Sequence, residues 1–116
     1  MRKLTRSVAA GALAAGLLTS PVLVGDAGAA STVGARVRIV DNAFMNSEVT
    51  ILVGERVVWK NNGSNTHTST SDTGKWDSGF LGPGARFGRV FRRAGTFTYH
   101  CTVHPSMQGT VIVNTP

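Results

Sequence analysis

The sequence predicts an all-β protein, an antiparallel sandwich or barrel of about seven or eight short strands. Three observations carry this prediction. Short runs alternate apolar and polar residues, Gly, Pro, Asn and Asp separate these runs at regular spacing, and no segment keeps uninterrupted helical spacing over three turns. Such patterns are typical of β-sandwiches and barrels. No internal repeat or linker is visible, so we expect one domain.

The first strands are predicted from runs rich in β-branched residues. Arg36 to Val40 alternates charged and β-branched side chains, which is the pattern of a half-buried strand. Two further runs are more apolar, and turn residues end each of the three. Strands are therefore expected at 36–40, 49–53 and 57–60, and the turns after them at 41–42, 54–55 and 61–65.

The later strands are predicted in the same way. The Thr-rich segment 66–71 is a strand candidate that is too polar to be buried on both faces. Simple alternation puts Arg89 on the same face as Phe87 and Phe91, so Arg89 lies at the rim of the sheet or a bulge resets the phase. Strands are expected at 86–93, 96–101 and 109–114, with turns at 72–74, 81–84 and 94–95.

Residues 1–29 are predicted to be a cleaved signal peptide. Basic residues precede an apolar stretch from Val8 to Leu18, and Ala27-Gly28-Ala29 offers an A-x-A cleavage site. The stretch is too short for a stable membrane anchor, although a retained anchor is the alternative. Residues 30–116 would then be one monomeric domain, exported to the periplasm or the extracellular space and not inserted in the membrane.

The charge of residues 30–116 bears on the choice of partner. This part of the chain has nine basic and five acidic residues, and four arginines lie within 86–93. A basic surface can meet an acidic protein, an anionic surface or nucleic acid. Nucleic acid is not expected, because the chain is exported and has no recognisable binding module. The arginines therefore form either a docking patch for an acidic partner protein or an ordinary solvated strand face.

One short stretch holds most of the candidate metal ligands. Residues 99–109 contain the only cysteine, two of the three histidines and one of the three methionines. Cys101, His104 and Met107 recur at every third position, and a tight loop can turn all three towards one point. Thiolate, imidazole and thioether together suit a copper ion that alternates between Cu(I) and Cu(II). A metal would also occupy a thiol that has no disulfide partner in an oxidising compartment.

The other two histidines have different expected roles. Tyr99 and Cys101 share the inward face of their strand, so His100 points away and is not expected to bind the metal. Copper held by such a set needs a second imidazole, and His67 is the histidine that remains. The predicted site is one copper ion bound by His67, Cys101, His104 and Met107.

These motifs resemble those of the cupredoxins, and within that family most closely amicyanin and its plastocyanin-related neighbours. The loop from Cys101 to Met107 has the short amicyanin-like spacing C-x-x-H-x-x-M, which is highly specific. Further motifs extend the resemblance over nearly the whole domain: V-V-W-K-N-N at 57–62, W-D-S-G at 76–79 and G-T-F-T-Y-H-C at 95–101.

The resemblance implies a Greek-key β-sandwich with one type 1 copper site. In such a site His67 and His104 bind through Nδ1, Cys101 binds through its sulfur, and Met107 is the weak axial ligand.

The resemblance also implies how electrons reach the metal. They pass through the exposed edge of His104, within an apolar patch to which Val103 and Pro105 could contribute. In the family the residue after the first ligand histidine is often Asn, which holds the two ligand loops together. This chain has Thr68 there, and its hydroxyl could partly replace the amide.

We therefore expect an electron carrier and not an enzyme. The alternative is extracytoplasmic copper storage or delivery by the same ligands. An enzyme with Cys101 as nucleophile and His67 or His104 as base has no acidic residue or Asn evidently placed to orient the base. A metal-free adhesion module would leave the grouping of His, Cys and Met to coincidence.

Overall fold

Eight strands form between residues 31 and 116, the part of the chain that the computed structural model describes. The predicted signal peptide, residues 1–29, lies outside this part. Nowhere in residues 31–116 is there a helix long and apolar enough to cross a membrane. The strands are β1 (Val33–Val40), β2 (Ala43–Met45), β3 (Glu48–Leu52), β4 (Arg56–Asn61), β5 (Thr70–Ser71), β6 (Arg86–Val90), β7 (Gly95–His100) and β8 (Gln108–Asn114).

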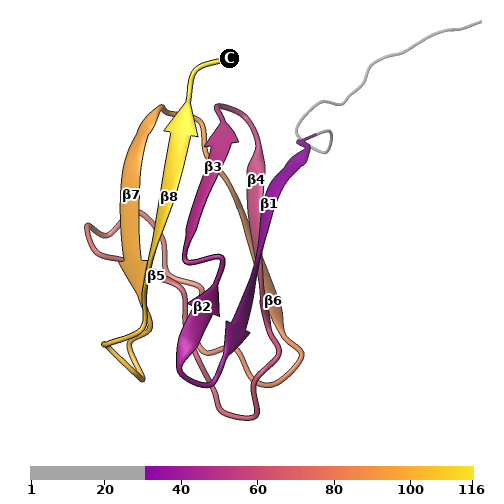
Figure 1. Ribbon diagram of the computed structural model, residues 1–116, viewed down its shortest axis with the longest axis vertical. Coiled ribbons are helices and arrows are strands. Elements are labelled where there is room, and N and C mark those ends of the chain that lie inside the picture. Colours follow the sequence, from indigo (N-terminus) through magenta and orange to yellow (C-terminus); the bar gives the residue numbers. More distant parts are fainter. Residues whose placement is uncertain (1–30) are drawn as a thin grey trace, which may run out of the picture. The chain divides into compact units, whose positions relative to one another are not determined.

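The strands make two four-stranded sheets, ordered β2-β1-β4-β6 and β3-β8-β7-β5, which pack as a sandwich (Figure 1). The all-β prediction is confirmed, and the described residues form no helix. The sheets are mixed and not purely antiparallel as expected, because β1 pairs with β4, and β3 with β8, in parallel. Side chains alternate in the same way along parallel and antiparallel strands, so the alternation does not show which pairing a strand adopts. Parallel neighbours also need a crossover connection, which the sequence pattern does not reveal.

Four strands differ from the prediction by more than one residue. β1 begins at Val33, three residues before its expected start at residue 36. Ala43–Met45 forms the short strand β2 beside the end of β1, where no strand was expected. Only Thr70–Ser71 of the Thr-rich segment is a strand, although His67 forms an isolated bridge with Leu81. The strand that was predicted to reach residue 93 ends at Val90.

The core lies between the two sheets and is rich in aromatic rings. Trp59 on β4 and Tyr99 on β7 are fully buried and meet edge to face, with ring centroids 5.4 Å apart. The ring of Tyr99 lies directly over Gly109, where a Cβ atom would come within 2.2 Å of Tyr99 Cζ. Gly109 is thus required for the first residues of β8 to pack against β7, and this packing fixes the end of the loop that follows Cys101.

Arg89 lies at the rim of the sandwich, on the edge strand β6. The pairing of β6 with β4 has no register shift, so a bulge does not reset the phase. The guanidinium carbon of Arg89 lies 5.1 Å from the ring centroid of Trp76 and 4.6 Å from that of Phe91. Partial burial lowers the pKa of this guanidinium. Of the two predicted explanations for Arg89, the rim position is correct.

Candidate metal centre

Three of the predicted ligands come together at one end of the sandwich. The donor atoms of His67, Cys101 and His104 all lie within 4.8 Å of one another. Cys101 Sγ is 3.7 Å from His67 Nδ1 and 4.0 Å from His104 Nδ1. His67 and Cys101 have no exposed surface, whereas His104 is half-buried. One thiol faced by two imidazole Nδ1 atoms is a donor set that fits a copper ion.

Cys101 enters the site from the inner face of β7, as alternation predicted. It follows β7 directly, and Tyr99 and Cys101 are both fully buried. Two backbone hydrogen bonds then close the loop: Cys101 N–H donates to Met107 C=O at 3.1 Å, and Met107 N–H donates to His104 C=O at 2.8 Å. Met107 is buried in the same loop. Its role as a fourth ligand stays a prediction.

His67 is held by its backbone on one side and by a carboxylate on the other. Its N–H and C=O both pair with Leu81, at 3.1 and 2.8 Å. Its Nε2 lies 3.1 Å from Asp41 Oδ1. Hydrogen bonds from His67, and then from the Asn65 and Ser64 backbone and the Ser64 hydroxyl, hold the pKa of Asp41 well below its usual range. Because Asp41 is ionised, it accepts a hydrogen bond from Nε2–H, and this leaves Nδ1 with its lone pair directed at Cys101.

Sequence reasoning missed Asp41. It was assigned only to the turn that ends the first strand, 26 residues before His67. The one signal available was that His67, a buried ligand, would need a partner for its second nitrogen, but three other acidic residues follow within the domain before Asp77. No spacing rule distinguishes Asp41 among them.

Thr68 ties the loop of His67 to the loop of Cys101. Its backbone N–H donates to Cys101 Sγ at 3.4 Å, and its Oγ1 accepts the backbone N–H of Thr102 at 2.9 Å. The two hydroxyls of Thr68 and Thr102 lie 3.3 Å apart. The hydroxyl thus makes a link between the two loops, as the sequence analysis suggested it could.

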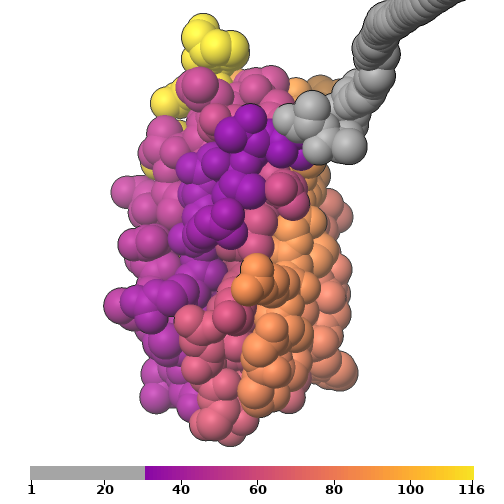
Figure 2. All heavy atoms as spheres, turned by 90° about the vertical axis from the view of Figure 1, so that its right-hand side faces the viewer, coloured from indigo at the N-terminus to yellow at the C-terminus, as the bar shows by residue number. Residues whose placement is uncertain are grey.

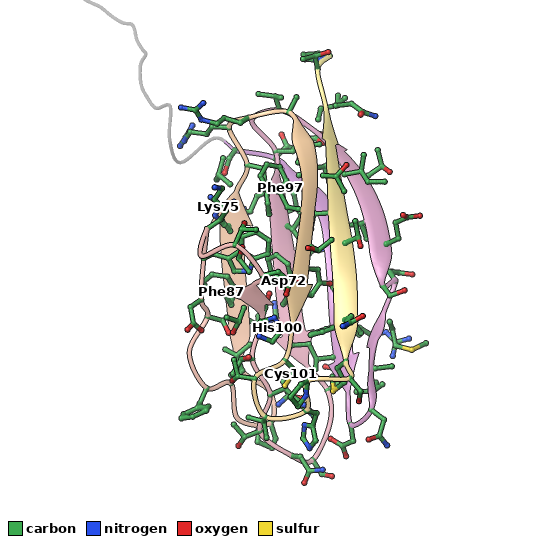
Figure 3. The ribbon with its side chains drawn as sticks, turned by 90° about the vertical axis from the view of Figure 1, so that its left-hand side faces the viewer. Asp72, Lys75, Phe87, Phe97, His100 and Cys101 are labelled. Atoms are coloured by element: carbon green, nitrogen blue, oxygen red, sulfur yellow. The ribbon has the colours of Figure 1, made fainter. Side chains whose placement is uncertain are left out.

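His100 takes no part in this cluster. Its Nδ1 lies 2.5 Å from Asp72 Oδ1, on the outside of the sandwich, and Figure 3 shows this pair above Cys101. Hydrogen bonding to Thr98 and then to His100 lowers the pKa of Asp72, so the carboxylate is ionised at neutral pH. The prediction that His100 points away from the metal site is consistent with this geometry.

Apolar side chains are exposed near His104. Val103 and Pro105, the neighbours that the sequence proposed for this patch, are both exposed. Phe80 is 77% exposed and directly precedes Leu81, whose backbone pairs with His67. Sequence reasoning missed Phe80, because an isolated Phe beside a turn resembles an ordinary core residue.

Comparison with known proteins places this site in a family. Residues 8–113 match the family model described as a cupredoxin-like domain. Amicyanin-alpha of Methylorubrum extorquens is 36% identical over 110 residues, which are 90% of this chain and 87% of the relative. Plastocyanin of Scenedesmus fuscus is 34% identical over 83 residues, covering 60% of this chain and 85% of the relative.

Solved structures agree with these relatives. An amicyanin mutant in its oxidized form superposes with a TM-score of 0.66 at 26% identity, covering 76% of this chain and 90% of the amicyanin. The copper-containing nitrite reductase of Thermus scotoductus superposes with a TM-score of 0.68 at 26% identity and covers 84% of this chain. That likeness extends over only 26% of the reductase, so it concerns one domain of the enzyme.

Proposed function

The chain belongs to the cupredoxin family, whose members bind one copper ion, and we propose that it carries single electrons between redox-partner proteins. The observation that carries the proposal is the buried thiol of Cys101 with an imidazole Nδ1 on each side, at 3.7 and 4.0 Å. We assign His67, Cys101, His104 and Met107 as the copper ligands. The bound copper would supply the one-electron change between Cu(I) and Cu(II).

The protein residues would keep the metal site in one arrangement in both oxidation states of the copper ion. Asp41 orients the ring of His67, and the Thr68 N–H donates to the sulfur of Cys101. Hydrogen bonds within the Cys101–Met107 loop hold His104 on the opposite side. Because these contacts are made between protein groups, little needs to move when an electron arrives. Hydrogen bonding and burial at the sulfur also tune the reduction potential.

We assign the edge of His104 as the point where electrons are exchanged. His104 is the half-buried member of the three, and exposed Val103 and Pro105 flank it in sequence. An apolar surface there lets a partner approach closely and exclude water. The burial of His67 and Cys101 supports this choice, because neither offers an edge to a partner.

We further propose that residues 1–29 direct export and are removed, so that residues 30–116 act in the periplasm or the extracellular space. The lone cysteine supports this, because the site gives the thiol a metal-binding role in an oxidising compartment. We propose no enzymatic activity for the chain itself. The likeness to nitrite reductase covers about a quarter of that enzyme, and the curated relatives are an amicyanin and a plastocyanin.

The visible spectrum tests the proposed function. Cu(II) added to the purified domain should produce an intense blue thiolate-to-copper band that bleaches on reduction and returns on oxidation. Cys101→Ala should remove the band, because it removes the thiolate that gives rise to it. A colourless product, or a band unchanged in Cys101→Ala, would contradict the proposal. Tight Cu(I) binding with rapid transfer to a chelator and no reversible couple would point to copper delivery.

A further inference from the structure

The outer face of one sheet carries most of the positive charge of the described residues. Side chains alternate along β1, β4 and β6, so the residues between the buried or half-buried positions point outwards together. Figure 2 views the molecule from this side, where indigo β1, rose β4 and orange β6 lie next to one another. We call it the basic sheet face, and its five cations are Arg36, Arg38, Arg56, Lys60 and Arg86.

The register of the strands sets these cations in rows across the sheet. Arg38, Lys60 and Arg86 are direct neighbours in one row, and Arg36 lies in the next row beside Val58. Two hollows of about 300 and 190 Å³ lie along this face, and Val58 lines both of them. The face is therefore a shallow surface with an apolar centre and a cationic border, which is how many protein interfaces are built.

No carboxylate of residues 31–116 forms an ion pair with this face. Among residues 31–116 the ion pairs within 4.0 Å are His67–Asp41 and His100–Asp72, and neither involves these five cations. The Nε atom of Arg56 is also buried without a hydrogen-bond partner in that part of the chain. A buried guanidinium N–H that lacks a partner usually finds one in water or a ligand. The face can thus accept carboxylates without first breaking an internal ion pair.

We propose that the basic sheet face is a docking surface for an acidic surface of the redox-partner protein. This inference rests on the proposed function. The location of the basic sheet face supports the proposal, because the row of Arg38 and Lys60 lies towards the metal-site end of the strands. Arg38 is three residues before Asp41, which contacts His67, and Lys60 precedes Asn61, whose amide donates to the C=O of Leu81. A partner seated there reaches the same end of the molecule as the copper ligands.

The chemistry of the face favours a protein over the other possible occupants. A second copy of this chain would bring like charges together, which is repulsive. The weak, short-lived complexes of redox proteins bury little area and depend on charge to steer their encounters. A rigid sheet face with unpaired cations around Val58 suits this kind of partner.

Binding of a model acidic ligand tests the proposal. The 15N-labelled protein in its Cu(I) form is titrated with a peptide of ten glutamates at low salt, and amide chemical shifts are recorded. The shifts should concentrate on β1, β4 and β6. Arg36→Glu/Arg38→Glu should weaken binding at least about tenfold, because it reverses two exposed charges on the face.

Arg92→Glu/Arg93→Glu is the matched control. It reverses two exposed arginines in the turn after β6, outside the basic sheet face, and changes the net charge equally. It should weaken binding less than about threefold, because salt screens distant charges. Arg36→Gln/Arg38→Gln replaces the first variant if that variant does not fold. The proposal would be overturned if both double variants weakened peptide binding equally, if the chemical shifts centred on Arg92 and Arg93, or if the peptide did not bind.

Two further titrations and one spectrum separate the remaining readings. Tighter binding of an oligothymidylate with ten phosphates, or of vesicles with one-quarter anionic lipid, at the same strands would assign the face to nucleic acid or membrane and overturn the proposal. The blue band and its bleaching are recorded on the same samples. If the blue band is absent but the peptide still shifts the amides of β1, β4 and β6, the electron-carrier function is contradicted. The basic sheet face would then still be supported as a docking surface for an acidic partner.

Discussion

The described residues contain two histidine–aspartate pairs, and these pairs use opposite ring nitrogens. His67 gives Nε2 to Asp41 and turns Nδ1 to Cys101. His100 uses Nδ1 for its contact with Asp72, which leaves Nε2 as its free ring nitrogen. His67 is fully buried, whereas the side chain of His100 is 29% exposed. The two histidines thus differ in the ring nitrogen that the carboxylate leaves free and in their burial.

The largest expected effect comes from removing each imidazole in turn. We predict that His67→Gln abolishes the intense blue band and lowers copper affinity by more than about 100-fold, because it removes a proposed ligand and not merely its support. His100→Gln should leave the band and the affinity unchanged. Copper titrations monitored by visible absorption measure both. Loss of the band in His100→Gln would mean that the assignment of the two histidines is reversed.

A smaller effect is expected from the two carboxylates. We predict that Asp41→Asn lowers copper affinity by about 10- to 100-fold, because the amide no longer fixes the tautomer that presents Nδ1 of His67. Asp72→Asn makes the same chemical change beside His100 and should not alter copper affinity. Competition with a chelator of known affinity gives both values. Equal affinity in the two variants would show that Asp41 has no part in orienting His67.

The comparison also shows how far sequence reasoning reaches. Alternation along one strand placed Tyr99 and Cys101 inwards and His100 outwards, because this information is local. The pairing of His67 with Asp41 depends on two segments 26 residues apart that meet only in the folded sheet. No sequence pattern in either segment predicts this contact.

The positive charges illustrate the same limit. The sequence groups four arginines in residues 86–93, but the fold separates them. Arg86 joins cations from β1 and β4 on the outer face, whereas Arg89 points to the other side and stacks on Trp76. The basic sheet face depends on the parallel pairing of β1 with β4, which the sequence did not predict. Charge clusters in sequence therefore do not correspond to charge clusters on this surface.

A third prediction concerns the hydrogen bond by which Thr68 links the loop of His67 to the loop of Cys101. Thr68→Val keeps the volume of the side chain but removes the hydroxyl that accepts the Thr102 N–H. The variant should lose about 1 kcal/mol of stability, which lowers the Tm of a domain of this size by about 4–8 °C. The blue band should persist, because the donor to Cys101 is the backbone N–H of Thr68.

Thr102→Val is the control for this link. It removes only the 3.3 Å contact between the two hydroxyls and keeps the Thr102 N–H, so its Tm should fall less. Thermal unfolding of both copper-loaded variants gives the comparison. An equal fall in the two variants would show that the N–H to Oγ1 hydrogen bond is not what holds the loops together.

The smallest effect is expected from the exposed pair, and it should depend on pH. The pKa of Asp72 is lowered in the folded protein, by hydrogen bonds to Thr98 and then to His100, relative to its value in an unfolded chain. A lowered carboxyl pKa contributes stability above the unfolded value and loses it as the pH falls through the folded value. Asp72→Asn should therefore be less stable than the unchanged protein at pH 6, and the difference should shrink towards pH 3.

The size of this difference should be small because the Asp72 side chain is 39% exposed and its interactions are screened by solvent. Exposed pairs contribute about 0.2–1 kcal/mol, so the two proteins should differ in free energy of unfolding by no more than that at pH 6. Urea unfolding of the metal-free proteins measures it and avoids copper loss in acid. The buried core around Trp59 and Tyr99 does not involve the metal and should keep these proteins folded. A difference that grows towards pH 3 would have the wrong sign, and it would mean that Asp72 stabilises the fold in its protonated form.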